Sequence, residues 1–114
     1  MRRNRKQYLK LREDARALAR NRLAHFNSFY NFPIGKLFIK NHKSRWGSCS
    51  SRGNLNFNYK IVLLPPEVAD YIIVHELCHL KEFNHSPKFW ALVAQTLPNH
   101  LALRHHLRRI ERTK

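Results

Sequence analysis

Hydrophobic residues recur every three or four positions along the first 30 residues, which is the period of an amphipathic helix. The apolar stripe consists of Tyr8, Leu11, Ala15, Leu18, Ala19, Leu23 and Phe26. Many of the positions around it are Lys or Arg, and the segment 31–35, with Pro33, ends the pattern. We therefore predict a basic helix over residues 1–30 that packs its apolar stripe against the core.

In the region 36–64 the hydrophobic residues recur at every second position, which predicts short strands. Leu55 and Phe57 alternate with three asparagines, as in a half-buried strand. The segments 37–39 and 43–50 precede this strand, and a turn containing Gly53 separates it from them. The pattern predicts a small antiparallel sheet of about three strands. We expect the apolar run 61–64 to close the sheet region.

Helical signals return over residues 66–112. Pro65 and Pro66 introduce one helix, Ser86-Pro87 supplies the N-cap and first residue of another, and Pro98 precedes a third. A chain of 114 residues is long enough for one modest core. The sequence thus predicts a single α+β domain over residues 1–114, with helices before and after a small sheet.

The helix that follows Pro66 contains the motif His75-Glu76-x-x-His79. Residues four apart lie on one helix face, so the two imidazoles can bind one metal ion. Glu76 lies about 100° round the helix, from where its carboxylate can reach a metal-bound water without being a ligand. The alternative is a pair of ordinary half-buried histidines on an amphipathic helix. Apolar neighbours on both sides supply the helix that the metal motif needs.

His85 is the candidate third ligand. The residues 81–84 are polar enough to leave the helix, and Asn84 tolerates the left-handed conformation that would return His85 to the metal. Three protein ligands leave the fourth position of tetrahedral zinc for water, which is typical of catalytic sites. We predict one Zn²⁺ ion held by His75, His79 and His85. With Glu76 activating the zinc-bound water, the predicted activity is hydrolysis of a peptide or protein substrate.

The charge of the chain keeps other functions open. It has 22 Lys and Arg against 7 Asp and Glu, a net charge of +15, which attracts polyanions. The candidate polyanion-binding residues, which would contact nucleic acid, are Arg2, Arg3, Arg5, Arg12, Arg16, Arg104 and Arg108. For any single arginine the simpler interpretation is a solvated face over the core. The alternatives to a peptidase are a zinc-dependent nucleotide or phosphodiester hydrolase and a nucleic-acid-binding module with structural zinc.

The rest of the sequence bears on the cellular location of the protein and on its remaining cysteines and histidines. There is no apolar run of membrane-spanning length and no short apolar segment after the basic start, so we expect a cytoplasmic protein without a membrane span. Cys49 and Cys78 are expected to be reduced core residues. His100, His105 and His106 are expected to be solvated histidines on a basic helix.

Five motifs occur in a fixed order between about residues 36 and 110. They are Arg45-Trp46-Gly47-Ser48-Cys49-Ser50, Gly53-Asn54-Leu55-Asn56-Phe57-Asn58, Pro65-Pro66-Glu67-Val68, the run from Tyr71 to Leu80, and Asn84-His85-Ser86-Pro87-Lys88-Phe89-Trp90. Together they resemble the YgjP-like family of zinc metallopeptidases, which is related to the SprT-like and WLM groups. The resemblance implies a minimal zincin-like fold, in which a small antiparallel sheet packs on the active-site helix. It also implies His75, His79 and His85 as ligands and Glu76 as the catalytic residue.

Overall fold

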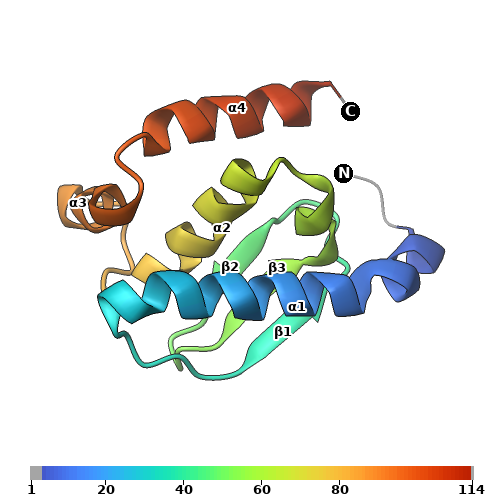
Figure 1. Cartoon of the computed structure of the whole chain (residues 1–114), viewed down its shortest axis with the longest axis horizontal. Coiled ribbons are helices and arrows are strands. Elements are labelled where there is room, and N and C mark those ends of the chain that lie inside the picture. The colour runs from blue at the N-terminus through green and yellow to red at the C-terminus, as the bar shows by residue number, and fades with distance from the viewer. Residues whose placement is uncertain (1–3, 114) are drawn as a thin grey trace.

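The computed structural model describes residues 4–113, which form four α-helices, three strands and a 3₁₀ helix. In chain order these are α1 (Arg5–Tyr30), β1 (Leu37–Lys40), β2 (Gly47–Cys49), β3 (Leu55–Asn58), η1 (Tyr59–Leu63), α2 (Pro66–Cys78), α3 (Pro87–Thr96) and α4 (His100–Arg112). Figure 1 shows α2 lying between α1 and α4, both of which it contacts. The predicted α+β fold class is confirmed.

Helix α1 begins and ends at asparagines. The side chain of Asn4 accepts a hydrogen bond from the Gln7 amide at 3.0 Å, and Asn31 adopts a left-handed conformation with φ of 58°. The buried residues of the helix are Ala15, Ala19, Leu23 and Phe26. They belong to the apolar stripe read from the sequence, so the amphipathic helix is confirmed from Arg5 onward. Arg2 and Arg3 lie outside the described residues.

Strand β3 is the centre of the sheet, whose order is β1-β3-β2. It pairs antiparallel with β2 but parallel with β1, which corrects the expectation of an all-antiparallel sheet. The chain leaves β1, passes to the far side of the sheet to form β2, and returns through a turn at Gly53 into the middle. The Asn58 side chain holds the passing segment by donating to the carbonyls of His42 and Arg45, both at 2.9 Å. Alternation along one strand does not encode the direction of its neighbour.

The segment expected to close the sheet region is instead part of a 3₁₀ helix. Asn58 caps η1 by accepting a hydrogen bond from the Lys60 amide at 3.1 Å. The turn buries Tyr59 and Ile61 completely and packs against α1. The Tyr59 hydroxyl also donates to the side chain of Gln7 at 2.7 Å. A short apolar run is compatible with a strand or with a helical turn, and here contact with α1 favours the helical turn.

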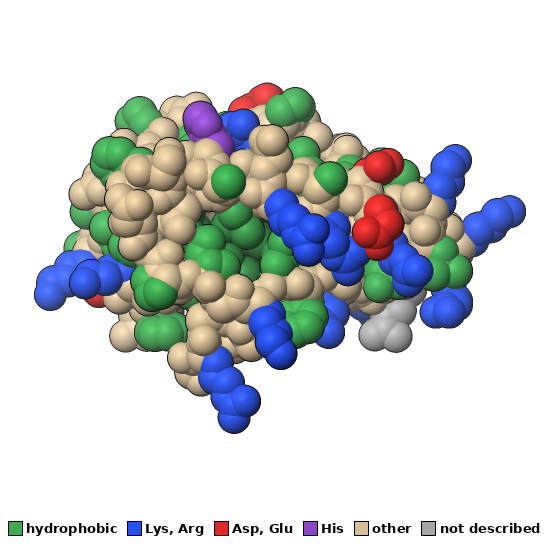
Figure 2. Space-filling model, turned by 60° about the horizontal axis from the view of Figure 1, so that its bottom comes forward, with side chains coloured by type: hydrophobic (Ala, Val, Ile, Leu, Met, Phe, Trp, Pro, Cys, Tyr) green, Lys and Arg blue, Asp and Glu red, His purple; other side chains and the backbone are tan. Residues whose placement is uncertain are grey.

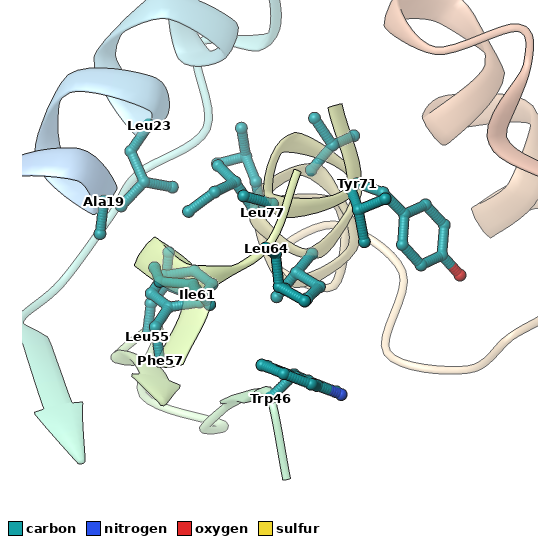
Figure 3. Close-up of a cluster of buried hydrophobic side chains, with 14 of the residues drawn as sticks. Ala19, Leu23, Trp46, Leu55, Phe57, Ile61, Leu64, Tyr71 and Leu77 are labelled. Carbon is teal, nitrogen blue, oxygen red and sulfur yellow. The ribbon is translucent and has the colours of Figure 1, made fainter. Parts of the chain in front are cut away.

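Helix α2 is the most enclosed element because α1, α3, α4, β2 and η1 all contact it. Figure 3 shows core side chains of β3, η1 and α1, among them Leu55, Phe57 and Ile61, gathered around α2, which contributes Leu77. Those four residues have no exposed surface. Close packing on nearly every side holds this helix, and therefore its functional residues, in one position.

Two polar contacts fix α1 to the helices beside it. Arg22 donates to both carboxylate oxygens of Asp70 in α2, at 2.8 and 3.0 Å. The Tyr30 hydroxyl donates to the Leu92 carbonyl in α3 at 2.5 Å. Between residues 4 and 113 no helix has the length and apolar character that a membrane span requires.

Candidate metal centre

His75 and His79 come together through helix geometry. Regular α2 ends at Cys78, and His79 is its C-cap residue, but its φ of −66° and ψ of −16° continue the right-handed turn. The four-residue spacing therefore still places both side chains on one face. Their ring centroids are 4.8 Å apart.

His85 completes a cluster of three imidazoles. Its Nε2 atom lies 3.0 Å from Nε2 of His79 and 3.1 Å from Nε2 of His75. One nitrogen from each residue lies within 4.8 Å of the other two. Within the described part of the chain these three residues form the cluster of His, Cys, Asp or Glu side chains that could hold a metal ion.

The three nitrogens fit a zinc ion by chemistry and by spacing. Ligand nitrogens at about 2.0–2.1 Å from a tetrahedral zinc ion lie about 3.3 Å from one another. The separations of His85 from the other two, 3.0 and 3.1 Å, are close to that value, and all three nitrogens lie within 4.8 Å of one another. Facing lone pairs at this distance repel unless a proton or a cation lies between them, so the cluster is suited to a metal.

Hydrogen bonds at the other ring nitrogens favour the metal-binding tautomer. Nδ1 of His79 lies 2.9 Å from the carbonyl oxygen of Glu82, and Nδ1 of His75 lies 3.1 Å from Oε2 of Glu76. Each oxygen can accept a hydrogen bond from an Nδ1–H group, and the tautomer that donates it has its lone pair on Nε2. Burial, and after it the neighbouring His75 and His79, lowers the pKa of His85. A lowered pKa favours the neutral imidazole that metals bind.

Aromatic residues of α3 support the cluster. Helix α3 begins as predicted, with Ser86 as N-cap and Pro87 as its first residue. Phe89 is fully buried and stacks on His79, with centroids 4.3 Å apart and planes at 21°. Trp90 stacks on His85, with ring centroids 5.8 Å apart and planes at 24°. These rings leave the imidazoles little freedom to rotate, so the three histidines are held close together by the protein itself.

The three histidines of the C-terminal region lie outside the cluster. His105 is exposed and His106 is half-buried. His100 differs from the expected solvated residue, because it is half-buried and stacks on Trp90 with centroids 5.3 Å apart and planes at 17°. His100 therefore packs near the histidine cluster without being part of it.

Glu76 opens onto a cavity of about 260 Å³ between α2, β2 and α4. The lining residues include Gly47, Tyr71, His75, Glu76, Arg104 and Arg108. A second hollow of about 320 Å³ is lined by Tyr71, His75, His85, Trp90 and Arg104. Three residues, namely Tyr71, His75 and Arg104, line both spaces. The two hollows therefore meet beside the histidine cluster.

Sequence reasoning did not assign Tyr71 to the metal site, and it placed Arg104 among the polyanion-binding candidates. Tyr71 precedes His75 by one helical turn, so its spacing could have placed it there. Gly47 and Arg104 carry no such local signal, because β2 and α4 reach the site only through folding.

The candidate polyanion-binding residues divide into two groups. Arg5 and Arg12 are exposed on α1, and Arg16 pairs with Glu13 at 2.6 Å. Arg104 and Arg108 instead line the cavity beside Glu76. The second group therefore belongs to the neighbourhood of the histidines.

A family model described as the YgjP-like metallopeptidase domain matches residues 2–110. The chain belongs to the YgjP-like family. The resemblance seen in the sequence motifs is thereby confirmed. No curated protein matches this YgjP-like chain.

Solved structures similar to this YgjP-like chain include two archaeal proteins. The crystal structure of the metallopeptidase zymogen of Pyrococcus abyssi abylysin aligns with a TM-score of 0.70 and 24% identity over 78% of this chain and 90% of that chain. The metallopeptidase zymogen of Methanocaldococcus jannaschii jannalysin aligns with a TM-score of 0.64 and 26% identity over 88% and 97%. The family and the shared fold support a metallopeptidase with a metal, most readily zinc.

Proposed function

We propose that this chain is a peptidase that holds one Zn²⁺ ion through His75, His79 and His85 and uses Glu76 as its general base. The convergence of three Nε2 atoms, 3.0 and 3.1 Å apart, beside a carboxylate that faces a cavity carries this proposal. Membership of a family with a metallopeptidase domain supports it.

Bound zinc would lower the pKa of water toward about 7 and polarise the carbonyl of the scissile bond. Glu76 takes the proton from water as the carbonyl is attacked and transfers it to the departing amine. Its side chain is only 9% exposed, and Oε2 lies 3.1 Å from Nδ1 of His75. The carboxylate is therefore held beside the ligands by the same rigid helix that carries them.

An extended substrate would pair with the free edge of β2. Both sides of β3 are occupied by its neighbours, whereas β2 pairs on one side only within the described sheet. Gly47 at the start of β2 lines the cavity that also contains Glu76. A peptide paired along β2 would therefore pass beside the general base.

Metal analysis and turnover test the proposal together. We expect one zinc per wild-type chain and loss of zinc in His75→Ala, His79→Ala and His85→Ala, while His105→Ala, which changes an exposed histidine, retains it. Glu76→Gln cannot act as a base, so it should keep zinc and lose turnover of a peptide library by about 10²–10⁴-fold. If the His85→Ala variant still bound one zinc per chain, His85 would be excluded as a ligand. Unchanged turnover in Glu76→Gln would exclude that residue as the base.

Phosphodiester hydrolysis is the second candidate because Arg104 and Arg108 line the cavity of Glu76. Guanidinium groups suit phosphate as well as carboxylate. A panel of nucleotides and dinucleotides in the same assay separates the two reactions. Hydrolysis of that panel without peptide cleavage would replace the peptidase proposal.

A further inference from the structure

We propose that Arg104 determines substrate specificity and that it selects peptides with a carboxylate within about three residues of the cleaved bond. The inference rests on the proposed peptidase function and adds a substrate class to it. It follows from where Arg104 lies, which charges surround it and what its guanidinium can bind.

Arg104 occupies the place where the two hollows meet. It lines both of them together with Tyr71 and His75. Its Cζ atom lies 5.6 Å from the centre of the Trp90 ring, which in turn lies 5.8 Å from the His85 ring and 6.0 Å from the His75 ring. An extended peptide advances about 3.3–3.6 Å per residue. The guanidinium is therefore within reach of a side chain or terminus about three residues or fewer from the histidine cluster.

The guanidinium of Arg104 has no carboxylate partner among residues 4–113. In contrast, Arg16 and Arg22 pair with acidic residues of α1 and α2. The hollow shared by His85, Trp90 and Arg104 has no acidic residue in its lining. The acidic residues near Arg104, Glu76 and Glu111, line the other cavity. In the hollow beside Trp90, the charge of this half-buried cation favours a ligand that brings a negative charge.

Trp90 fixes the position of the Arg104 guanidinium. The Arg104 guanidinium lies over the indole ring, a contact that holds the side chain near the histidines through cation–π attraction. A planar guanidinium held in one place can donate two parallel hydrogen bonds to a carboxylate. The same group repels a lysine or arginine of the substrate. Arg108, one turn further along α4, lines the cavity of Glu76 but not the second hollow.

The carboxylate could come from an Asp or Glu side chain or from the C-terminus of the peptide. The chemistry at Arg104 is the same in both cases. Paired peptides with free and amidated C-termini distinguish them, because amidation removes only the terminal charge.

Cleavage of a mixed peptide library by the full zinc-loaded chain provides the first test. We expect Asp, Glu or a free C-terminus to be enriched within three residues of the cleaved bonds for wild type. Arg104→Gln should lose that enrichment, and Arg104→Glu should favour Lys and Arg instead. Arg109→Gln is the matched control, since it removes the same charge from an exposed position of the same helix. Absence of acidic enrichment in wild type, or its persistence in both Arg104 variants, would overturn the inference.

Binding provides a second readout that does not need turnover. In zinc-loaded Glu76→Gln protein, the fluorescence of Trp90 and Trp46 follows titration with peptide pairs that differ by Glu against Gln. We expect the Glu peptide to bind about tenfold more tightly, and the additional Arg104→Gln change to abolish the difference. If the Glu peptide binds more tightly than the Gln peptide but wild type cleaves no peptide, the peptidase function is rejected. The carboxylate-binding role of Arg104 then stands. Equal binding of both peptides, or tighter Arg104-dependent binding of adenosine monophosphate, would reject the carboxylate site.

Discussion

At Gly47 the missing side chain leaves room for Glu76. A Cβ atom at this position would lie 3.0 Å from Cγ of Glu76, 3.1 Å from the carbonyl oxygen of Asn56 and 3.2 Å from a ring carbon of Phe57. Two of these neighbours belong to the central strand and the packed core, so Glu76 is the one that can move. A single methyl group on β2 would therefore displace the proposed base.

We predict that Gly47→Ala keeps zinc and lowers kcat by about tenfold or more, because small misplacements of a catalytic group are costly. Zinc content and turnover measured on the same sample test this. Ser48→Ala, on the next residue of the strand, is the control and should behave like wild type. Full activity in Gly47→Ala would show that Glu76 does not depend on the space beside β2.

The thiol of Cys49 is predicted to be unreactive near neutral pH. Burial, followed by the negative charge of Glu76, raises its pKa to about 11. Since only the thiolate is nucleophilic, the reactive fraction at pH 8 falls by about a hundredfold relative to an ordinary thiol. Iodoacetamide labelling mapped by mass spectrometry should be slow in the folded protein, rapid in urea, and faster as pH approaches 11. Labelling of the folded protein at the denatured rate would contradict this.

At the scale of elements, α4 is attached to the sheet as well as to α2. Trp46, the residue before β2, donates from Nε1 to Oε2 of Glu111 in the last turn of α4 at 2.9 Å. Leu103 and Leu107 are the buried residues of α4. The helix that carries Arg104 is therefore fixed by an apolar contact near its middle and a hydrogen bond near its end.

We predict that Glu111→Ala destabilises the fold by about 1 kcal/mol, because it leaves the indole N–H of the buried Trp46 without its acceptor. Glu111→Gln retains an oxygen acceptor and should cost less. Urea unfolding measures both changes, and amide exchange should show faster opening of α4 in the alanine variant. Equal losses in the two variants would mean that charge, rather than this hydrogen bond, is responsible.

At the scale of the molecule, the chain carries a net charge of +15. Figure 2 shows Lys and Arg side chains projecting from several sides of one face, with acidic side chains beside some of them. On α1 the exposed basic residues include Arg5, Lys10, Arg12 and Arg20. A dispersed charge of this kind attracts polyanions without selecting a sequence.

We predict that the protein binds duplex DNA only at low salt and without sequence preference. Each phosphate contact should add about −0.9 to the slope of log affinity against log salt. Changing Arg5, Lys10, Arg12 and Arg20 to Gln should reduce both affinity and slope, whereas Arg104→Gln should change them little. Weak binding without a salt slope in wild type would identify the basic surface as a solvated face.

The three histidines and α1 could be predicted because their information is local. His75 and His79 are four residues apart on one helix, and His85 follows after a short polar turn, so backbone geometry alone brings them near one another. The apolar stripe of α1 is likewise a repeat along neighbouring residues. Such periods survive folding, since they belong to the helix itself.

The direction of β1, the turn at η1 and the place of Arg104 were decided only by tertiary structure. Alternating polarity assigns the two faces of a strand but not its neighbour, and β1 became parallel because β3 entered between it and β2. Contact with α1 made η1 helical. Arg104 reads as a surface arginine in the sequence, and it faces the histidines because α4 packs on α2 and stays attached to β2 through Glu111. These contacts join residues far apart in the chain, so the local periodicity of the sequence does not predict them.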